Sequence, residues 1–289
     1  MNFTVDKMIP DKMANAAVII LNWRAPNMTL RAVTGVFDQS LRPRRVFVVE
    51  NGSGDDSAAI LARGLSEYGS RATLLVNNRN LGFGGGCNTA LREILASDYA
   101  YCWLLNNDAE PEPECLANLV ATADDTPSIG AVGSLIIDPN ASESDHFGSW
   151  LHPFMLVSRA MREPGEMARH RFAWMTAASL LISTAALRQV GLFDERYFMY
   201  WEDADLNMRL RAAGFAIAAA PAARVKHLAG TSSHHLATRR YLWHFASQRL
   251  WLRKHHPLGV AMIPLLRAKY LLKAGLDRDL ERLKSLLKA

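Results

Sequence analysis

Residues 16–23 read AAVIILNW, six consecutive apolar residues followed by Asn22 and Trp23. An apolar run of this length is typical of a strand buried on both faces, as in a parallel sheet. The neighbouring segments repeat the theme, with further apolar strands predicted at 46–49, 73–76 and 99–105 and helices at 28–37, 57–65 and 87–95. Strands that alternate with helices of this size predict βαβ units, and hence an α/β fold with a mostly parallel central sheet flanked by helices.

Polar residues follow each of the four predicted strands. The four turns are Asn22-Trp23, residues 50–56 (ENGSGDD), the Gly-rich loop 77–88, and Asn106-Asn107-Asp108. Ligands of open α/β sheets bind beyond the carboxyl ends of the strands. One such turn is equally typical of a helix cap, the favoured reading for Ser53, Asp55 and Asp56 taken alone. Four together favour a polar binding site at one edge of the sheet.

The second half of the chain has a different pattern. Strands are predicted at 177–182, 215–220 and 224–228, a short helix at 184–190, and a longer helix at 201–213 that ends at Gly214. From about residue 236 the chain is predicted to be helical, with interruptions at Pro257 and Pro264.

Two groups of carboxylates suggest chemistry. Asp108 at a strand mouth suits Mg2+ or Mn2+, which prefer oxygen ligands and share few protein carboxylates with substrate phosphates. Taken alone, it is more typical of an Asp in a turn or helix cap before Pro111. Glu202, Asp203 and Asp205 open a helix, where the macrodipole also favours carboxylates. The aromatic residues beside them, at 197, 198, 200 and 201, favour a sugar-facing cleft over a solvated helix start.

Two other features are weaker signals. His227, at a possible strand end, is a candidate metal ligand, although a satisfied or exposed histidine is the commoner case. The segment 82–86 (GFGGG) departs from a dinucleotide fingerprint, because Cys87 stands at the third glycine. A Gly-rich loop that leads into a helix still allows close approach to phosphate or ribose.

The charge of the chain is uneven. The net charge is +5, but residues 224–289 hold 14 Lys and Arg against three acidic residues. One predicted helix interleaves these cations with aromatic residues: Arg239, Arg240, Tyr241, Trp243, Arg249, Trp251, Arg253 and Lys254. This pattern favours peripheral contact with an anionic membrane surface. Packing on the rest of the chain, together with a homodimer contact, is the alternative.

Composition indicates an ordered protein of the cytoplasm. The N-terminal residues have no apolar run typical of a signal peptide, and no stretch approaches the ~18 apolar residues of a membrane span. The three cysteines, Cys87, Cys102 and Cys115, have no metal-ligand spacing and are expected to be unbridged thiols. The chain also lacks the sequence signatures of RNA-binding modules, so no nucleic-acid partner is expected.

Six segments, in this order along the chain, resemble those of the family 2 inverting glycosyltransferases with the GT-A fold, particularly the bacterial rhamnosyltransferase-like branch. They are AAVIILNW at 16–23, VFVVENGSGDDS at 46–57, NRNLGFGGGCNTAL at 78–91, WLLNNDAEP at 103–111, GLFDERYFMYWEDADLNMRLRAAG at 191–214 and VKHLAGTSS at 225–233. Each segment is weak alone, and together they are very specific. The resemblance implies a GT-A catalytic domain over 1–235, with a nucleotide-binding half at about 14–110, an acceptor half at about 111–235, and a basic helical extension at 236–289.

The resemblance also implies roles for individual residues. Asp203 would be the catalytic base, and Asp108 and His227 would bind the divalent metal, Mg2+ or Mn2+. The implied substrate-binding residues are Asn22, Trp23, Glu50, Asn51, Ser53, Asn80, Gly82, Asn88, Asn106, Asn107, Trp201 and Glu202. Two positions depart from the family pattern, since the family often has Asp in place of Glu50 and in place of Asn106.

The function implied is transfer of a sugar from a nucleotide-diphosphate donor to an acceptor hydroxyl in bacterial polysaccharide or glycolipid synthesis. The donor would be dTDP-linked, with rhamnose as the first choice, or UDP-linked, and the acceptor a sugar or a lipid-linked sugar. Two alternatives stay open from the residues alone. One is a nucleotide-sugar or nucleic-acid binding protein without transferase activity, and the other is a nucleotidyltransferase acting on sugar phosphates.

Overall fold

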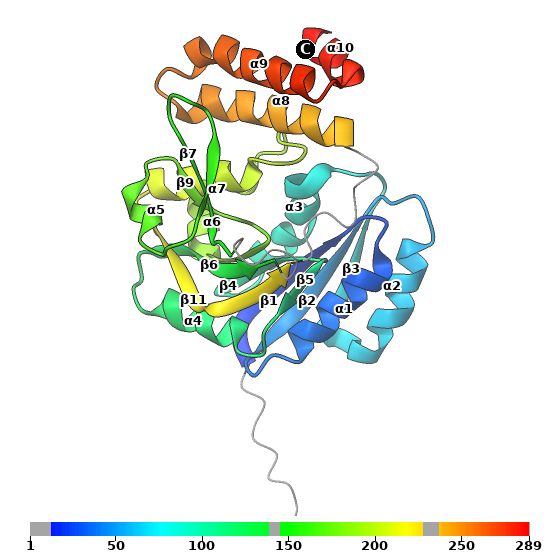
Figure 1. The fold of residues 1–289 in the computed structure, drawn as a ribbon. Helices are drawn as coiled ribbons and strands as arrows, with labels where there is room; N and C mark the ends of the chain where they lie inside the picture. Colours follow the sequence, from blue (N-terminus) through cyan, green and yellow to red (C-terminus); the bar gives the residue numbers. More distant parts are fainter. Residues whose placement is uncertain (1–12, 139–144, 228–236, 289) are drawn as a thin grey trace, which may run out of the picture.

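The computed structural model describes residues 13–138, 145–227 and 237–288. An eight-stranded sheet lies at its centre, in the order β3-β2-β1-β4-β10-β6-β11-β5, with helices on both faces (Figure 1). A second sheet of three strands, β8-β7-β9, lies beside it. The predicted α/β fold with a flanked central sheet is confirmed.

The first half of the chain alternates strands with helices, as its apolar pattern predicts. Its elements are β1 (Met13–Asn22), α1 (Pro26–Phe37), β2 (Arg42–Asn51), α2 (Ser57–Leu65), the 3-10 helix η1 (Ser66–Arg71), β3 (Ala72–Asn77), α3 (Gly82–Leu95) and β4 (Tyr101–Asn106). Strands β3, β2, β1 and β4 are parallel neighbours.

The second half adds short strands and antiparallel pairs. Its elements are β5 (Ala109–Pro111), α4 (Cys115–Asp124), β6 (Ile129–Ile137), β7 (Gly148–Leu151), β8 (Ser158–Met161), α5 (Glu166–Arg169), β9 (Ala173–Met175), β10 (Ser179–Ser183), α6 (Thr184–Val190), α7 (Glu202–Ala212) and β11 (Ala216–His227). Strand β10 is antiparallel to both β4 and β6, while β11 is parallel to β6 and antiparallel to β5.

The core of the central sheet has two apolar faces. On β1, Val18 and Ile20 point to a cluster that includes side chains of α1, α2 and α4. Ala17 and Ile19 point to the opposite cluster, which includes side chains of α3, α6 and α7. Both faces of a strand must be apolar when both are covered, which explains why residues 16–21 show no alternation.

The two strands expected near the end of the second half need correction. The strands expected at 215–220 and 224–228 form one strand, β11, whose register on β6 shifts between Ala220 and Arg224. Pro221 lies in that irregularity, where its missing N–H breaks no ladder bond. Residue 228 lies outside the described residues.

Three helices form the C-terminal layer, drawn in orange to red in Figure 1: α8 (Ala237–His255), α9 (Gly259–Leu276) and α10 (Leu280–Lys288). The chain does break near Pro257, but Pro264 lies inside α9 and does not end it. The carbonyl that loses its partner there belongs to Val260, an exposed position where water can solvate it. Among the described residues, no helix has the length and apolar character needed to cross a membrane.

Candidate active site

The carboxyl ends of the four parallel strands form one row at an edge of the sheet. Asn22 on β1 lies opposite Glu50 on β2, and Asn51 lies opposite Asn77 on β3. Strand β4 ends in the same row, with Asn106 paired to the residue that precedes Asn22. The parallel register therefore brings together polar strand ends that are far apart in the sequence.

Asn22 stands at the centre of this row and is fully buried. Its Oδ1 accepts a hydrogen bond from the Thr29 hydroxyl at 2.8 Å, and that hydroxyl accepts one from Asn107 Nδ2 at 3.2 Å. The Nδ2 of Asn22 is buried and has no hydrogen-bond partner among the described residues. Because buried polar atoms are nearly always paired, this amide is the group that a ligand would satisfy. Thr29 was missed from the sequence, because it looks like an ordinary position in the first turns of α1.

The Glu50 carboxylate organises the loop that follows β2. It accepts hydrogen bonds from the backbone N–H of Gly52 at 3.1 Å, from that of Ser53 at 2.9 Å, and from the Ser53 hydroxyl. Ser53 in turn binds Arg24. The Arg24 backbone N–H donates to the Ser53 hydroxyl at 2.9 Å, and Arg24 Nε donates to the Ser53 carbonyl at 3.1 Å. Only glycine fits at Gly52, since a Cβ there would lie 2.1 Å from the Arg79 backbone. Glu50 and Ser53 thus fix the shape of this turn through bonds within the protein.

Asn51 joins β2, β3 and the start of α3. Its Oδ1 accepts from Asn77 Nδ2 at 3.0 Å and from the Leu81 N–H at 3.2 Å. Its Nδ2 donates to Asn80 Oδ1 at 3.2 Å and to the Gly82 carbonyl at 2.9 Å. The Asn51 amide is therefore fully used within the protein, and it positions the residues around it.

The Gly-rich segment expected as a loop is the beginning of α3, which starts at Gly82. Glycine costs about 1 kcal/mol relative to alanine in a helix, so close packing must require it here. Gly82 has a φ of +77° and a Cβ on it would lie 2.0 Å from the Phe198 carbonyl oxygen, while one on Gly84 would lie 2.9 Å from Phe193 Cβ. The glycines let α3 lie directly against the 193–198 segment.

Asn88, on α3, is buried and binds the same segment. Its Oδ1 accepts from the Phe193 N–H at 3.0 Å, and its Nδ2 donates to the Phe193 carbonyl at 3.0 Å and to Glu195 Oε1 at 2.9 Å. Asn88 therefore ties α3 to the loop that leads into α7.

Asp108 and His227 meet at the end of β4. Strand β5 pairs with β11 so that His227 lies opposite Ala109, which brings the imidazole to the preceding residue. The His227 Nε2 lies 3.0 Å from Asp108 Oδ1 and 3.2 Å from Asn106 Nδ2. Both side chains are largely buried, with Asp108 8% and His227 16% exposed.

This donor set fits a divalent cation. A carboxylate oxygen and an imidazole nitrogen converge on one point, and the Asn106 amide that adjoins them also carries an oxygen. Among the described residues, no cluster of three or more His, Cys, Asp or Glu side chains forms a closed metal cage. The arrangement suits an ion that takes its remaining ligands from water and from substrate phosphates, as Mg2+ commonly does.

The turn before α7 contains aromatic side chains that face inward. Tyr197 is fully buried and Trp201 is 3% exposed. The Trp201 ring lies 5.2 Å from the Trp174 ring and 5.3 Å from the Trp251 ring, centre to centre. The side chains of Tyr197 and Trp201 therefore pack in the interior, which corrects the expectation that these two line a sugar-facing cleft. The backbone φ of +69° at both Tyr200 and Trp201 produces a sharp entry into α7.

Asp203 and Glu202 occupy the first turn of α7 in different surroundings. Asp203 is partly buried, and its two carboxylate oxygens accept from the backbone N–H groups of Ala177 at 3.3 Å and Ala204 at 2.7 Å. Burial raises the pKa of Asp203 to about 6 despite these bonds. Burial, with the nearby Asp203 charge, raises the pKa of Glu202 well above its usual value, and its buried Oε2 has no partner in the part of the chain that the structure describes.

Two consecutive residues connect Asp203 with the metal-fitting end of β4. The Asn106 N–H donates to the Ala178 carbonyl at 2.9 Å, and the Ala177 N–H donates to Asp203 Oδ2. Segment 177–178 thus contacts both Asp203 and Asn106, and the Asn106 amide in turn adjoins His227, which lies against Asp108.

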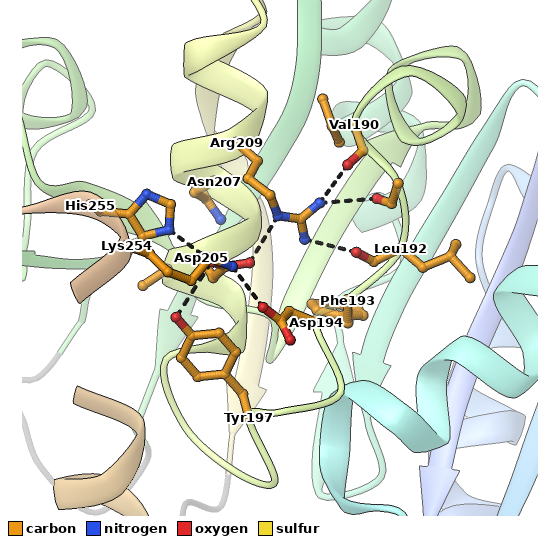
Figure 2. A network of polar contacts seen from close by, with 12 residues as sticks. Val190, Leu192, Phe193, Asp194, Tyr197, Asp205, Asn207, Arg209, Lys254 and His255 are labelled. Carbon is orange, nitrogen blue, oxygen red and sulfur yellow. Dashed lines mark hydrogen bonds and ion pairs between the residues drawn. The ribbon is translucent and has the colours of Figure 1, made fainter. Parts of the chain in front are cut away.

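Asp205, two residues further along the same helix, belongs to a buried ionic cluster (Figure 2). Its carboxylate is fully buried and contacts Arg209 Nε at 2.8 Å, Lys254 Nζ at 2.5 Å and His255 Nε2 at 2.7 Å, and the Tyr197 hydroxyl at 3.4 Å. Burial acts to raise the pKa of Asp205, but hydrogen bonds from His255 and Lys254 and the Arg209 charge outweigh it and hold the pKa below its usual value. Asp205 therefore connects α7 to α8, and no sequence pattern pointed to this long-range pairing.

The fold is that of the GT-A glycosyltransferases. Two solved structures share this fold. One is a mannosyltransferase from Pyrobaculum calidifontis in complex with GDP-Man and Mn2+, with a TM-score of 0.62 and 18% identity over 96% of this chain and 75% of that one. The other is GalNAc-T7 with UDP, GalNAc and Mn2+, with a TM-score of 0.61 and 15% identity over 73% of this chain and 43% of that one. The L-rhamnosyltransferase of Mycobacterium tuberculosis named for N-acetylglucosaminyl-diphospho-decaprenol is 29% identical over 238 residues, which cover 74% of this chain and 76% of that one.

The chain belongs to the family described as glycosyltransferase like family 2, whose model matches residues 14–250. It is therefore a glycosyltransferase, as the six sequence segments implied. This membership decides against a binding protein without transferase activity. The match extends into α8, which lies beyond the boundary expected near residue 235. That domain boundary stays a prediction.

Proposed function

We propose that this glycosyltransferase is metal-dependent and inverting, and that it moves a sugar from a nucleotide-diphosphate donor to an acceptor hydroxyl. Rhamnose from a dTDP-linked donor is the first choice, with UDP-linked sugars behind it. The observation that carries the proposal is a chain of contacts that runs from Asp203 through segment 177–178 to Asn106, whose amide adjoins His227, the partner of Asp108. The unsatisfied amide of Asn22 lies on the neighbouring strand. The relative named as a rhamnosyltransferase supports the choice of sugar.

In this proposal, Asp108 and His227 hold Mg2+ or Mn2+ next to the donor diphosphate. The ion would offset the negative charge that develops on the leaving nucleoside diphosphate. Mn2+ in the two solved structures with this fold supports a divalent cation. Asn22 and the turn shaped by Glu50 and Ser53 would take the nucleoside, because this edge of the sheet offers the buried unpaired amide donor.

Asp203 acts as the general base. A new bond forms between the acceptor oxygen and the anomeric carbon while the bond from that carbon to the diphosphate oxygen breaks, and the acceptor proton passes to an Asp203 oxygen. One displacement of this kind inverts the anomeric centre. A pKa of about 6 keeps the carboxylate ionised at neutral pH and makes it a stronger base than an ordinary aspartate. A positioned base is worth typically ~10²–10⁴ in rate.

The acceptor is proposed to be a lipid-linked sugar, reached at the inner face of the plasma membrane. Support comes from the acceptor in the relative's name, a diphospho-decaprenol. The basic tail offers cations for an anionic surface. Its aromatic residues do not serve this purpose in the structure, because Trp251 is buried and the Trp243 ring packs on Phe198 at 4.8 Å.

A thermal-shift screen of nucleotide sugars, with Mn2+, Mg2+ or EDTA, tests the donor and the metal together. We expect one nucleotide sugar to raise Tm only when the cation is present, since both share the site at Asp108. The product formed from that donor is then examined by NMR at its anomeric carbon. Retained configuration would contradict the single displacement, and stabilisation unaffected by EDTA would contradict the metal site.

A further inference from the structure

A second cavity, of about 380 Å3, lies between the β7–β8 turn and the α8–α9 turn. In Figure 1 the green β7–β8 hairpin reaches up to the orange C-terminal layer at this point. Trp150, Phe154, Phe172 and Leu258 are among the residues that line it. No residue assigned above to the nucleotide, the metal or the base lines this cavity, so it is a separate feature.

The rim of the cavity holds large apolar side chains in water. Of the lining residues, Phe154 is 66% exposed on one side and Leu258 is 55% exposed on the α8–α9 side. Close to them in sequence, Met155 is 58% and Val260 70% exposed, and we count both with the rim. Exposed apolar side chains that gather around a hollow mark a binding surface more often than chance exposure does.

The β7–β8 turn presents these side chains from a firmly held backbone. Leu156 is fully buried at a φ of +53°, and its carbonyl accepts from Gln248 Nε2 at 3.2 Å and from Lys269 Nζ. The Phe154 and Met155 N–H groups point to His152 Nδ1 at 3.4 and 3.1 Å. The turn is thus anchored on α8 and α9 while Phe154 and Met155 stay exposed, so their exposure is built into the fold.

The lining of the cavity is basic as well as apolar. Arg169 and Arg171 line it, and no carboxylate does. Arg169 pairs with Glu163 at 3.1 Å, but both side chains are about two-thirds exposed, so this pair is weak and easily replaced. The Arg171 guanidinium lies over the Phe172 ring at 5.4 Å. A ligand that carries both an apolar chain and a phosphate anion complements this combination.

Strand β9 connects the cavity with the proposed base. Phe172 lines the cavity, and Ala177, five residues later, donates its N–H to Asp203. Even fully extended, five residues span at most roughly 16 Å at about 3.3 Å per residue, so the cavity lies within about this distance of the backbone group that binds Asp203. That is a distance that a diphosphate and the start of a lipid chain could bridge.

We propose that the cavity binds the first isoprenoid units of a polyprenyl diphosphate-linked sugar acceptor, with Arg169 and Arg171 beside the diphosphate. This inference rests on the proposed function and names the acceptor class for it. The apolar rim of Phe154, Met155, Leu258 and Val260 covers the chain as it leaves the bilayer.

Isothermal titration with farnesyl diphosphate, a soluble polyprenyl diphosphate, tests the cavity without any transfer. The full-length protein is first saturated with Mn2+ and a nucleoside diphosphate, so that the donor site is blocked. We expect binding to wild type, and a Kd at least tenfold higher in Phe154→Asp, Leu258→Asp and Arg171→Gln. Leu276→Asp is the matched control, because Leu276 is 75% exposed on α9 and lies outside the cavity. Farnesol and inorganic diphosphate should each bind more weakly than farnesyl diphosphate.

Three results would overturn the proposal. The first is an unchanged Kd in all three cavity variants. The second is displacement of farnesyl diphosphate by the nucleoside diphosphate, which would put the ligand in the donor site. The third is equal sensitivity of the same variants to anionic phosphatidylglycerol vesicles free of polyprenyl phosphates, which would indicate membrane docking instead. Because binding is measured without transfer, these results leave the proposed reaction untouched, and a failure to find transfer leaves the binding result intact.

Discussion

Glu202, Asp203 and Asp205 lie within one turn of α7, yet their surroundings give them three different properties. Asp205 is fully buried against Arg209, Lys254 and His255, and these contacts hold its pKa below the usual value, so it stays ionised. Glu202 is buried without such partners, so its pKa rises well above the usual value. Asp203 is partly open, accepts two backbone N–H bonds, and has a pKa of about 6. Only Asp203 combines access to solvent with a pKa suited to a general base at neutral pH.

The pH dependence of transfer follows from the raised pKa of Asp203. Below about pH 6 its carboxyl group holds a proton and cannot accept another, so kcat/KM should fall about tenfold per pH unit as pH decreases through this value. The measurement is kcat/KM for the acceptor from pH 4.5 to 8.5, at saturating donor and Mn2+. A profile that stays flat down to pH 5 would exclude Asp203 as the titrating base.

Asp108 and His227 are expected to act as a pair in metal binding, since their side-chain atoms lie 3.0 Å apart. Asp108→Asn or His227→Ala should raise the Mn2+ concentration for half-maximal transfer by roughly tenfold or more, about 1.4 kcal/mol of binding free energy. Titrations of activity with Mn2+ provide the measurement. Glu110→Gln is the matched control, because Glu110 is an exposed carboxylate two residues after Asp108. The same Mn2+ requirement in wild type, in the two site variants and in the control would rule out this site.

At the scale of elements, the sequence predicted the parts that depend on local pattern. The unbroken apolar run 16–21 and its repeats identified the parallel strands, and Asn22 and Asn106 marked where they end. Pairing between distant segments left no local signal. The β5–β11 pairing that brings His227 to Asp108 is an example, and the contact of Lys254 with Asp205 is another. The glycines at 82–86 were taken for a loop because local preference disfavours them in a helix, whereas close contact with the 193–198 segment requires them.

The contact between α3 and the loop before α7 is expected to depend on Gly82. Gly82→Ala adds a methyl group 2.0 Å from the Phe198 carbonyl oxygen and also strains a positive φ. Gly69→Ala is a matched control, because Gly69 has a φ of +56° with no atom within 4 Å of the added methyl. A non-glycine residue in such a sparsely populated backbone conformation costs about 1–3 kcal/mol, so Gly69→Ala should lower Tm and leave activity intact. Gly82→Ala should lower Tm further and reduce kcat, and equal effects of the two changes would contradict the packing argument.

At the scale of the whole molecule, side chains of the C-terminal helices and of the segments around β7, β9 and the start of α7 form one apolar cluster. Trp251 of α8 is fully buried against Trp201 and Phe172, and Lys254 and His255 reach the Asp205 carboxylate on α7 (Figure 2). The sequence left open whether the tail packs on the rest of the chain or contacts a membrane. Helix α8 packs on the rest of the chain. Packing of α8 and contact with a membrane do not exclude each other, because α8 packs through buried side chains, whereas membrane contact would use the exposed apolar side chains at the cavity rim.

Coupling between the tail and the site is tested by Lys254→Met. The change leaves the buried Asp205 carboxylate with one cation fewer, which we expect to cost about 2 kcal/mol, below the ~3–5 kcal/mol of a fully broken buried pair. That corresponds to a Tm lower by roughly 4–8 °C in a protein of this size. Arg253→Met, an exposed neighbour on the same helix, should change Tm little. Equal Tm values for the two variants would mean that the cluster does not hold α8 on α7.

The role of Asp203 as the base is the central claim, and the single-turnover rate of Asp203→Asn tests it most directly. The amide keeps the shape of the carboxylate but cannot take the acceptor proton. It also removes the buried negative charge that is present above pH 6, but its NH2 group cannot accept from one of the two backbone N–H groups that bond to Asp203, so the two effects on stability at pH 8 oppose each other. We predict that Asp203→Asn binds the nucleotide sugar and Mn2+ with a Kd within about twofold of wild type while transfer falls by ~10²–10⁴. Transfer at the wild-type rate, with the same donor affinity, would contradict the account.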